Sequence, residues 1–264
     1  MLGDLLGAAK RAGWRACAEA DARAKVGTPA TQNAVLMYHS VGGREGNAGG
    51  RRLDEAAFRA QLAWLDTHYE FVDLPAALDA GSTPRVALTF DDGYRDFRSR
   101  ALPILREFDA PATVFVIADR IGGRSDNGVP YLDAEDVAAL AADDLVTVGN
   151  HTRTHPHLDR LDPDAVRAEV VDARAELEAR VGRDVTRFCY PYGDCSPAVV
   201  DVVRESHDYA TAGDGILAGP TDPHLIPRVD GSHPQAVVRW ELTGAAERLR
   251  RAVRGEALSG QPET

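Results

Sequence analysis

Short apolar runs alternate with amphipathic segments along most of the chain. The runs are rich in β-branched residues and fit buried strands; they cover residues 34–38, 69–72, 86–90, 112–117, 145–148, 186–190, 208–211 and 225–229. Apolar residues at helical spacing predict helices between them, over residues 54–68, 74–80, 95–108, 133–142, 162–181 and 234–253, with a further helix starting at Ser196. Side chains that suit helix N-caps precede four of these helices: Asp54, Asp133, Asp162 and Ser196.

This regular alternation of strands and helices is typical of a parallel sheet covered by helices. We therefore predict a single-domain α/β fold, a distorted (β/α) barrel of about seven parallel strands with outer helices. Residues 34–253 would form this domain, preceded by an N-terminal helix and linker over 1–33 and followed by a polar tail over 254–264. Four chemically capable residues directly follow predicted strands and should share one face of the barrel: His39, Asp91, His151 and Pro191.

The net charge argues against nucleic acid as a partner, and the length of the apolar segments argues against a membrane span. The 41 acidic residues outnumber the 30 basic ones, and a net charge of −11 does not suit nucleic-acid binding. No segment approaches the roughly 20 apolar residues that span a bilayer. Residues 2–22 fit an amphipathic helix that either packs on the domain or makes weak contact with a membrane surface.

The N-terminus and the cysteines bear on localisation. The first 25 residues lack an unbroken apolar core and do not resemble a secretory signal. Three cysteines (Cys17, Cys189 and Cys195) do not form a disulfide framework, although a Cys189–Cys195 bridge would be feasible in an oxidising compartment. These features favour the cytoplasm and leave an extracytoplasmic location open.

Two groups of polar residues suggest metal chemistry. Asp91 and Asp92 follow an apolar strand, where two adjacent carboxylates are costly unless a cation compensates them; alternatively, they cap the next helix. His151 and His155 are four residues apart and could reach one ion from a single helical turn. Two histidines and one carboxylate suit a divalent Zn, Co, Ni or Fe ion, and His157 is expected to face solvent.

These motifs carry a family resemblance. Thr89–Gly93 (TFDDG), His151–His155 (HTRTH) and Phe188–Gly193 (FCYPYG) resemble, in order and spacing, three motifs of the polysaccharide deacetylases with NodB homology, carbohydrate esterase family 4. The segment VLMYHSVG at residues 35–42 resembles the subgroup that contains the poly-N-acetylglucosamine deacetylases. The resemblance covers residues 34–244.

The resemblance implies a role for each matching residue. Asp92, His151 and His155 would hold a divalent metal, most often Zn, while Asp91 would act as general base on the attacking water. The backbone N–H of Tyr192 would donate to the developing oxyanion. The implied partner is an N-acetylated glycan or sugar precursor; the oligomeric state stays open.

Two departures from the family pattern change the expected site. Cys189 stands where many relatives have an arginine that pairs with the base, so we predict that Arg228 pairs with Asp91 instead; the alternative is a surface pair with Asp230. A C-terminal Leu-x-His motif is not evident. The resemblance to the poly-N-acetylglucosamine deacetylase subgroup, in which the acid comes from the N-terminal strand, implies that His39 is the general acid, with His233 as the next candidate. Alternatively, His39 is a buried histidine that hydrogen-bonds a loop.

Aromatic residues could line a sugar-binding groove. Tyr94, Pro191 and Tyr192 are the predicted substrate contacts, and Tyr38 could also stack on a sugar. Trp64 and Trp240 lie on predicted helices, where core packing is the expected role.

Removal of N-acetyl groups from a glycan is the favoured function. O-deacetylation of a xylan-type substrate uses the same metal chemistry and stays open. A catalytically inactive glycan-binding barrel and hydrolysis of a small amide are further alternatives. The intact Asp91, Asp92, His151 and His155 set argues against the inactive barrel.

Overall fold

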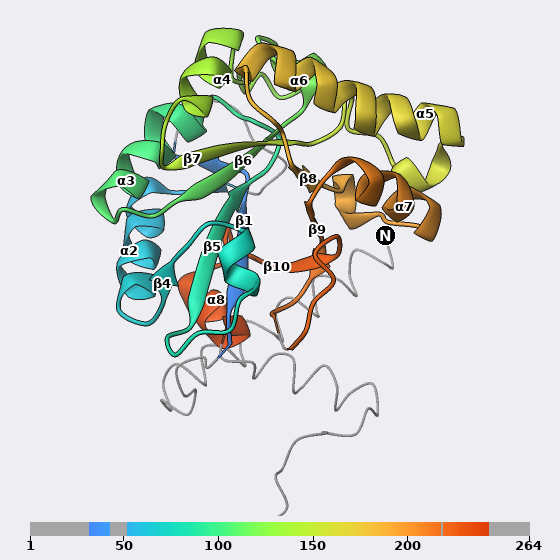
Figure 1. Cartoon of the computed structure of the whole chain (residues 1–264). Helices are drawn as coiled ribbons and strands as arrows, with labels where there is room; N and C mark the ends of the chain where they lie inside the picture. Colours follow the sequence, from blue (N-terminus) through green and yellow to red (C-terminus); the bar gives the residue numbers. More distant parts are fainter. Residues whose placement is uncertain (1–31, 43–51, 218, 243–264) are drawn as a thin grey trace, which may run out of the picture.

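Seven parallel strands close into a barrel in the computed structural model, which describes residues 32–42, 52–217 and 219–242 (Figure 1). In chain order the barrel strands are β1 (Ala34–Tyr38), β5 (Arg85–Phe90), β6 (Ala112–Val116), β7 (Val146–Asn150), β8 (Arg187–Cys189), β9 (Tyr209–Asp214) and β10 (Ile226–Asp230). Neighbours follow the order β1-β10-β9-β8-β7-β6-β5, and β1 also pairs with β5, which closes the ring. The predicted barrel is therefore confirmed.

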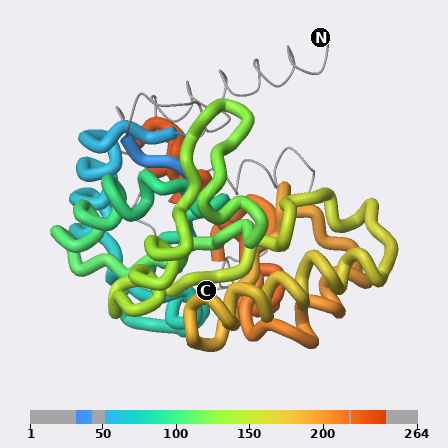
Figure 2. Tube along the Cα trace, turned by 90° about the horizontal axis from the view of Figure 1, so that it is seen from above, coloured from blue at the N-terminus to red at the C-terminus, as the bar shows by residue number. Residues whose placement is uncertain are grey.

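Three short strands lie outside the ring. The strand β4 (Glu70–Phe71) adds to β5, and β2 (Ser40–Val41) pairs with β3 (Arg52–Leu53) in a separate two-stranded sheet. The outer layer is formed by α2 (Glu55–Asp66), α3 (Leu102–Glu107), α4 (Ala134–Ala141), α5 (Pro163–Arg167), α6 (Ala173–Val181), α7 (Pro197–Ser206) and α8 (Gln235–Leu242). The outer helices follow the chain around the barrel from α2 through α3 to α4, and the next helices lie with α6 beside α4 and α5 beside α7 (Figure 1 and Figure 2).

The strand pattern places one set of side chains inside the barrel and the other against the helices. Because both faces of a helix-covered parallel strand are buried, such a strand is a continuous apolar run. Val35, Ala87, Phe115, Cys189 and Ile226 belong to one buried cluster, which fills the inside. The residues next to them, such as Leu36 and Leu88, pack in the cluster shared with the outer helices. On β5 the alternation continues inward through Thr89 to Asp91 at the mouth.

Local signals set the helix ends. The side chains of Asp54, Asp133, Asp162 and Ser196 each accept a hydrogen bond from a backbone N–H of the first helical turn, as predicted. The helix predicted from residue 95 instead starts with a π-helical turn, Phe97–Ala101, that leads into α3. Pro103 in the first turn of α3 lacks the N–H that would bond to Ser99, and this missing bond accounts for the wider turn.

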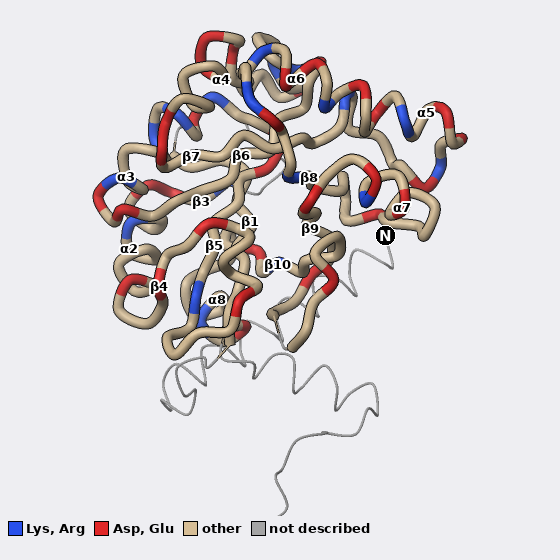
Figure 3. Tube along the Cα trace, in the orientation of Figure 1, with Lys and Arg blue, Asp and Glu red and all other residues tan. Residues whose placement is uncertain are grey.

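The surface carries mixed charges rather than a basic face. Acidic and basic residues alternate along α5 and α6, whereas the barrel strands are mostly uncharged (Figure 3). Ion pairs such as Arg59–Glu107 and Arg167–Glu205 join neighbouring outer segments. Trp240 is buried in the core and Trp64 packs at its edge, as predicted. Within the described residues, no helix combines the length and apolar character needed to cross a membrane.

The predicted N-terminal helix with its contact segment 2–22, the linker as far as residue 31 and the polar tail 254–264 lie outside the described residues.

Candidate active site

The predicted site residues meet at one end of the barrel. His39 follows β1, Asp91 and Asp92 follow β5, and His151 follows β7. A short turn of the 3-10 type, η6 (Pro191–Gly193), starts two residues after β8. Since all barrel strands are parallel, their carboxyl ends share this face.

Asp92, His151 and His155 form a set of possible metal ligands. The Asp92 Oδ1 atom lies 3.6 Å from the Nε2 atoms of both His151 and His155. Ligand atoms about 2.1 Å from a shared zinc ion are roughly 3.4 Å apart in a tetrahedral site. The spacing and the donor types of these three side chains therefore fit a divalent cation.

The backbone of the His151–His155 segment differs from the helical turn that the spacing suggested. Thr152 and His155 have φ angles of 67° and 68°, in the left-handed region, so the segment is a loop. The Asn150 Oδ1 atom accepts from the Thr152 N–H, and the Thr152 hydroxyl accepts from the His155 N–H. Both histidines thus reach the site because side-chain hydrogen bonds fold the loop locally. Sequence reasoning missed Asn150, although its place directly before His151 was a signal.

The surroundings shift the pKa values of the two histidines, His151 and His155, in opposite directions. His151 is buried, and its Nδ1 atom lies 2.8 Å from the Cys189 carbonyl oxygen, so Nδ1 carries a proton and Nε2 faces Asp92. Burial alone would lower the pKa of His151, but Cys189 and the carboxylates of Asp91 and Asp92 outweigh it and raise the pKa to about 10. Burial and the neighbouring His151 lower the pKa of His155 to about 4.

Asp91 and Arg228 form the predicted buried pair. Arg228 Nη1 lies 2.7 Å from Asp91 Oδ1, and Nη2 lies 2.8 Å from Oδ2, so the contact is bidentate. Burial alone would raise the pKa of Asp91, but the Arg228 guanidinium outweighs burial and holds the pKa well below its usual range. The alternative surface pair of Arg228 with Asp230 is wrong, because Arg228 is buried in the barrel mouth.

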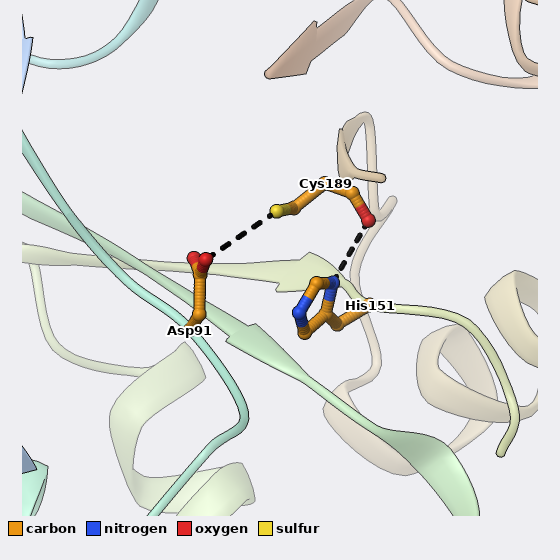
Figure 4. A group of neighbouring side chains, drawn as sticks. All are labelled: Asp91, His151 and Cys189. Carbon is orange, nitrogen blue, oxygen red and sulfur yellow. Dashed lines mark hydrogen bonds between the residues drawn. The ribbon is translucent and has the colours of Figure 1, made fainter. Parts of the chain in front are cut away.

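Cys189 completes a buried group with Asp91 and His151 (Figure 4). Its Sγ atom lies 3.7 Å from Asp91 Oδ2 and 3.1 Å from Arg228 Nη2. These three side chains also offer ligand-type atoms within 4.8 Å of one another. However, the Arg228 guanidinium already contacts both Asp91 oxygens and the sulfur, which provides the compensating positive charge. A cation therefore fits the Asp92 set better. Cys189 and Cys195 are free thiols.

The two candidate acids differ in their surroundings. His39 is half-buried and close enough to Asp91 to lower the pKa of that carboxyl. His233 is half-buried with 42% of its side chain exposed, and its Nε2 atom is 4.0 Å from Asp230 Oδ2. His39 therefore has the better position for proton transfer at the mouth.

The predicted groove aromatics separate into buried and exposed residues. The Tyr94 ring is buried and stacks on Tyr131, with centroids 5.1 Å apart, so its predicted role as an open sugar contact is corrected. Burial first, and then Asp92 and Tyr131, raise the pKa of Tyr94 above its usual range. Pro191 is also buried, and Tyr38 lies in the core bonded to Gln61. Neither Pro191 nor Tyr38 offers an open ring to a sugar.

Tyr192 is the exposed aromatic residue at the site. Its side chain is 63% exposed, and its φ angle is 59°. The ring packs edge-to-face on His155, with centroids 4.7 Å apart, and stacks on His157 at 4.1 Å. His157 in turn bonds through Nδ1 to Asp194 Oδ2. The prediction that His157 faces solvent is therefore corrected, because the His157 ring stacks on Tyr192 of the third motif and bonds to Asp194 directly after that motif.

A family model described as polysaccharide deacetylase matches residues 79–210. The Bacillus subtilis (strain 168) protein YxkH, assigned by name to the polysaccharide deacetylases, is 30% identical over 166 residues, which cover 60% of this chain and 56% of YxkH. The poly-beta-1,6-N-acetyl-D-glucosamine N-deacetylase of Escherichia coli (strain K12) is 28% identical over 135 residues, which cover 45% of this chain and 20% of that protein. The chain thus spans about half of YxkH and a fifth of the second relative.

Solved structures share the fold. The structure of IcaB from Ammonifex degensii superposes with a TM-score of 0.68 at 24% identity, covering 80% of this chain and 97% of that chain. This similarity supports the barrel architecture independently of the motifs.

Proposed function

Because this chain belongs to the polysaccharide deacetylase family, we propose that it is a metal-dependent hydrolase that removes N-acetyl groups from a glycan containing N-acetylglucosamine. One observation carries the proposal: the two adjacent carboxylates have different partners. Asp92 faces two histidines, whereas Asp91 is held by Arg228. This difference supports Asp92 as a ligand of a cation and Asp91 as the acceptor of a proton.

Asp92, His151 and His155 would hold the cation. A divalent cation there supplies Lewis acidity, which polarises the acetamide carbonyl and lowers the pKa of water from 15.7 toward about 7. The Nδ1–H of His151 donates to the Cys189 carbonyl and fixes the ring, so that Nε2 is presented to the site.

Asp91 would be the general base. Arg228 keeps it ionised and fixes both oxygens, yet each carboxylate oxygen has a second lone pair that can accept a proton from water. His39 would protonate the leaving amine, and the Tyr192 N–H would donate to the oxyanion. Base and acid then lie near each other at the mouth, since His39 influences the pKa of Asp91.

The substrate class rests on chemistry and on the named relative. The Escherichia coli relative is named for a β-1,6-linked N-acetylglucosamine polymer. A glycan with this acetamide, in either β-1,4 or β-1,6 linkage, offers the carbonyl and the amine that this site would process. An O-acetylated xylan and a small acetamide are the comparison substrates.

Acetate release tests the proposal. The full chain, loaded with Zn²⁺ or Co²⁺, is incubated with a chito-oligosaccharide, a β-1,6-linked N-acetylglucosamine oligosaccharide, an acetylated xylan and N-methylacetamide. We expect acetate from at least one N-acetylglucosamine oligosaccharide, and no release after chelation or by Asp92→Ala. Release from the xylan alone would replace the proposal with esterase activity. Binding of the oligosaccharides without release from any of the four would indicate an inactive glycan-binding barrel.

A further inference from the structure

Tyr192 holds a backbone conformation that is costly for its residue type. A non-glycine residue in the left-handed region costs of order 1–3 kcal/mol and persists where its surroundings fix it. At Tyr192 φ is 59° and ψ is 0°. The next residue, Gly193, has a φ of 76°, and a Cβ atom there would lie 3.2 Å from the Gly213 backbone nitrogen. The turn that contains Tyr192 and Gly193 therefore packs closely against β9. Contacts of the Tyr192 side chain can stabilise the left-handed conformation of Tyr192.

Two histidines make these contacts: His155, which ends the second motif, and His157, two residues after it. The His157 ring lies parallel to the Tyr192 ring, with an interplanar angle of 16° and centroids 4.1 Å apart. The His155 ring meets Tyr192 at 71°. His157 is itself fixed, because Nδ1 bonds to Asp194, two residues after Tyr192. The loops of the second and third motifs are thus connected through one stacked pair and one side-chain bond.

We propose that His157, fixed by Asp194, is a positioning residue that holds Tyr192 in its left-handed conformation, and that the uncovered face of the Tyr192 ring is a stacking surface for a sugar next to the reacting residue. The proposal deepens the proposed function and rests on it. His157 acts through Tyr192, whose backbone N–H would serve the oxyanion and whose ring would serve the neighbouring sugar.

The exposure of the ring supports the second half of the proposal. Stacking on His157 covers one face of Tyr192, and yet 63% of the residue remains exposed. Tyr94, Pro191 and Tyr38 are buried. Among the described residues predicted to line a groove, Tyr192 alone therefore presents an open aromatic surface, and the apolar face of a pyranose is the ligand that such a surface suits.

A second cation is the competing explanation for the same geometry. His157, Asp159 and Asp194 offer ligand-type atoms within 4.8 Å of one another. The hydrogen bond between His157 and Asp194 already accounts for their closeness, and Asp159 is exposed. The two explanations make different predictions for Asp159, which makes Asp159→Asn the matched control.

Variants of His157 and Asp194 test positioning in the metal-loaded full chain. We expect His157→Ala to lower kcat about 10- to 100-fold, somewhat less than deletion of an oxyanion donor. His157→Phe keeps the stacked ring and should restore most of the loss, and Asp194→Asn, which keeps an acceptor, should exceed Asp194→Ala in activity. Asp159→Asn should match the parent protein. A loss with Asp159→Asn as large as with Asp194→Ala, together with a second bound metal equivalent, would overturn the proposal in favour of a cation site.

A double-variant cycle tests whether His157 acts through Tyr192. Glycine adopts positive φ without strain, so Tyr192→Gly removes the ring and keeps the backbone N–H. We expect Tyr192→Gly to raise KM for oligosaccharides about tenfold, which corresponds to a loss of about 1.4 kcal/mol of stacking free energy. KM for a monosaccharide should stay nearly unchanged. His157→Ala should then cause no further loss in the Tyr192→Gly background. A full additional loss would show that His157 acts elsewhere.

Amide hydrogen exchange separates this proposal from the proposed function. The Gly193 and Asp194 N–H groups donate to Tyr190 and Pro191 within the turn. We expect faster exchange at both in His157→Ala and parent-like exchange in His157→Phe. If the parent protein releases no acetate while exchange changes in this way, the proposed function alone fails. If acetate is released and His157→Ala alters neither exchange nor kcat, the positioning proposal fails.

Discussion

Replacement of Arg228 by lysine tests how the site controls its general base. Arg228 donates to both Asp91 oxygens, to the Thr89 hydroxyl and to the Cys189 sulfur, and it is buried. Lysine keeps the charge but cannot reproduce the planar fork. We expect Arg228→Lys to fold with a free energy of unfolding lowered by about 3–6 kcal/mol, because about two hydrogen bonds to a charged group are lost.

The effect on catalysis follows from orientation and charge. A carboxylate displaced by about 1 Å can cost 10²-fold in rate, so kcat should fall about 10- to 100-fold. Arg228 lowers the pKa of Asp91, and a weaker pair would let that pKa rise. Asp91 would then become protonated at a higher pH, and the acidic limb of the kcat/KM profile should move upward. Metal content should stay near the parent value, since Arg228 does not contact Asp92, His151 or His155 in any described hydrogen bond.

Arg187→Lys is the matched control. Arg187 starts β8, at the opposite end of the barrel, and its Nη2 lies 3.0 Å from Oδ2 of Asp73, whose side chain is about half exposed. This variant should lose stability in urea unfolding while it keeps the parent kcat and pH profile. A parent-like kcat and an unshifted acidic limb in Arg228→Lys, measured with confirmed metal loading, would refute the role of Arg228 in holding the base.

Three further predictions concern separate parts of the molecule. Asp92→Ala should lose bound metal and activity together. Asp91→Asn should keep its metal, as measured by atomic absorption, and lose several orders of magnitude in kcat. An Asp92→Ala protein that still binds metal and is fully active would contradict the ligand set. His39→Gln should keep metal, lower kcat about 10²- to 10⁴-fold and remove the alkaline limb of the pH profile, and an unchanged profile would direct attention to His233. Burial, then Arg174 and His224, lower the pKa of His207 to about 3, so the unfolded state binds a proton that the folded state does not between about pH 6.5 and pH 3. The free energy of unfolding should therefore fall as the pH drops through this range, by at most about 1.4 kcal/mol per pH unit. Urea unfolding at pH 7, 6 and 5 should show a weaker pH dependence of this free energy in His207→Gln. An equal pH dependence in the variant and the parent protein would contradict the role of His207.

Features that depend on neighbours along the chain could be predicted from the amino-acid sequence. Apolar runs predicted the barrel strands, because a parallel strand covered on both sides must be apolar throughout. Asp54, Asp133, Asp162 and Ser196 marked helix starts, since a cap bonds to a backbone N–H two or three residues away. The residue types at strand ends also indicated metal chemistry, because parallel strands bring those ends to one face.

Which of these side chains meet, and which are exposed, depends on the packing of the folded chain. Arg228 and Asp91 are 137 residues apart, and their bidentate contact depends on the closure of the barrel between β1, β5 and β10. Tyr94 directly follows the first motif and Tyr192 lies within the third. Packing on Tyr131 buries Tyr94, whereas Tyr192, with its positive φ, is exposed and stacks on His157. Such contacts depend on the packing of distant segments and on local backbone conformations that other side chains hold, and neither is encoded in hydrophobic periodicity.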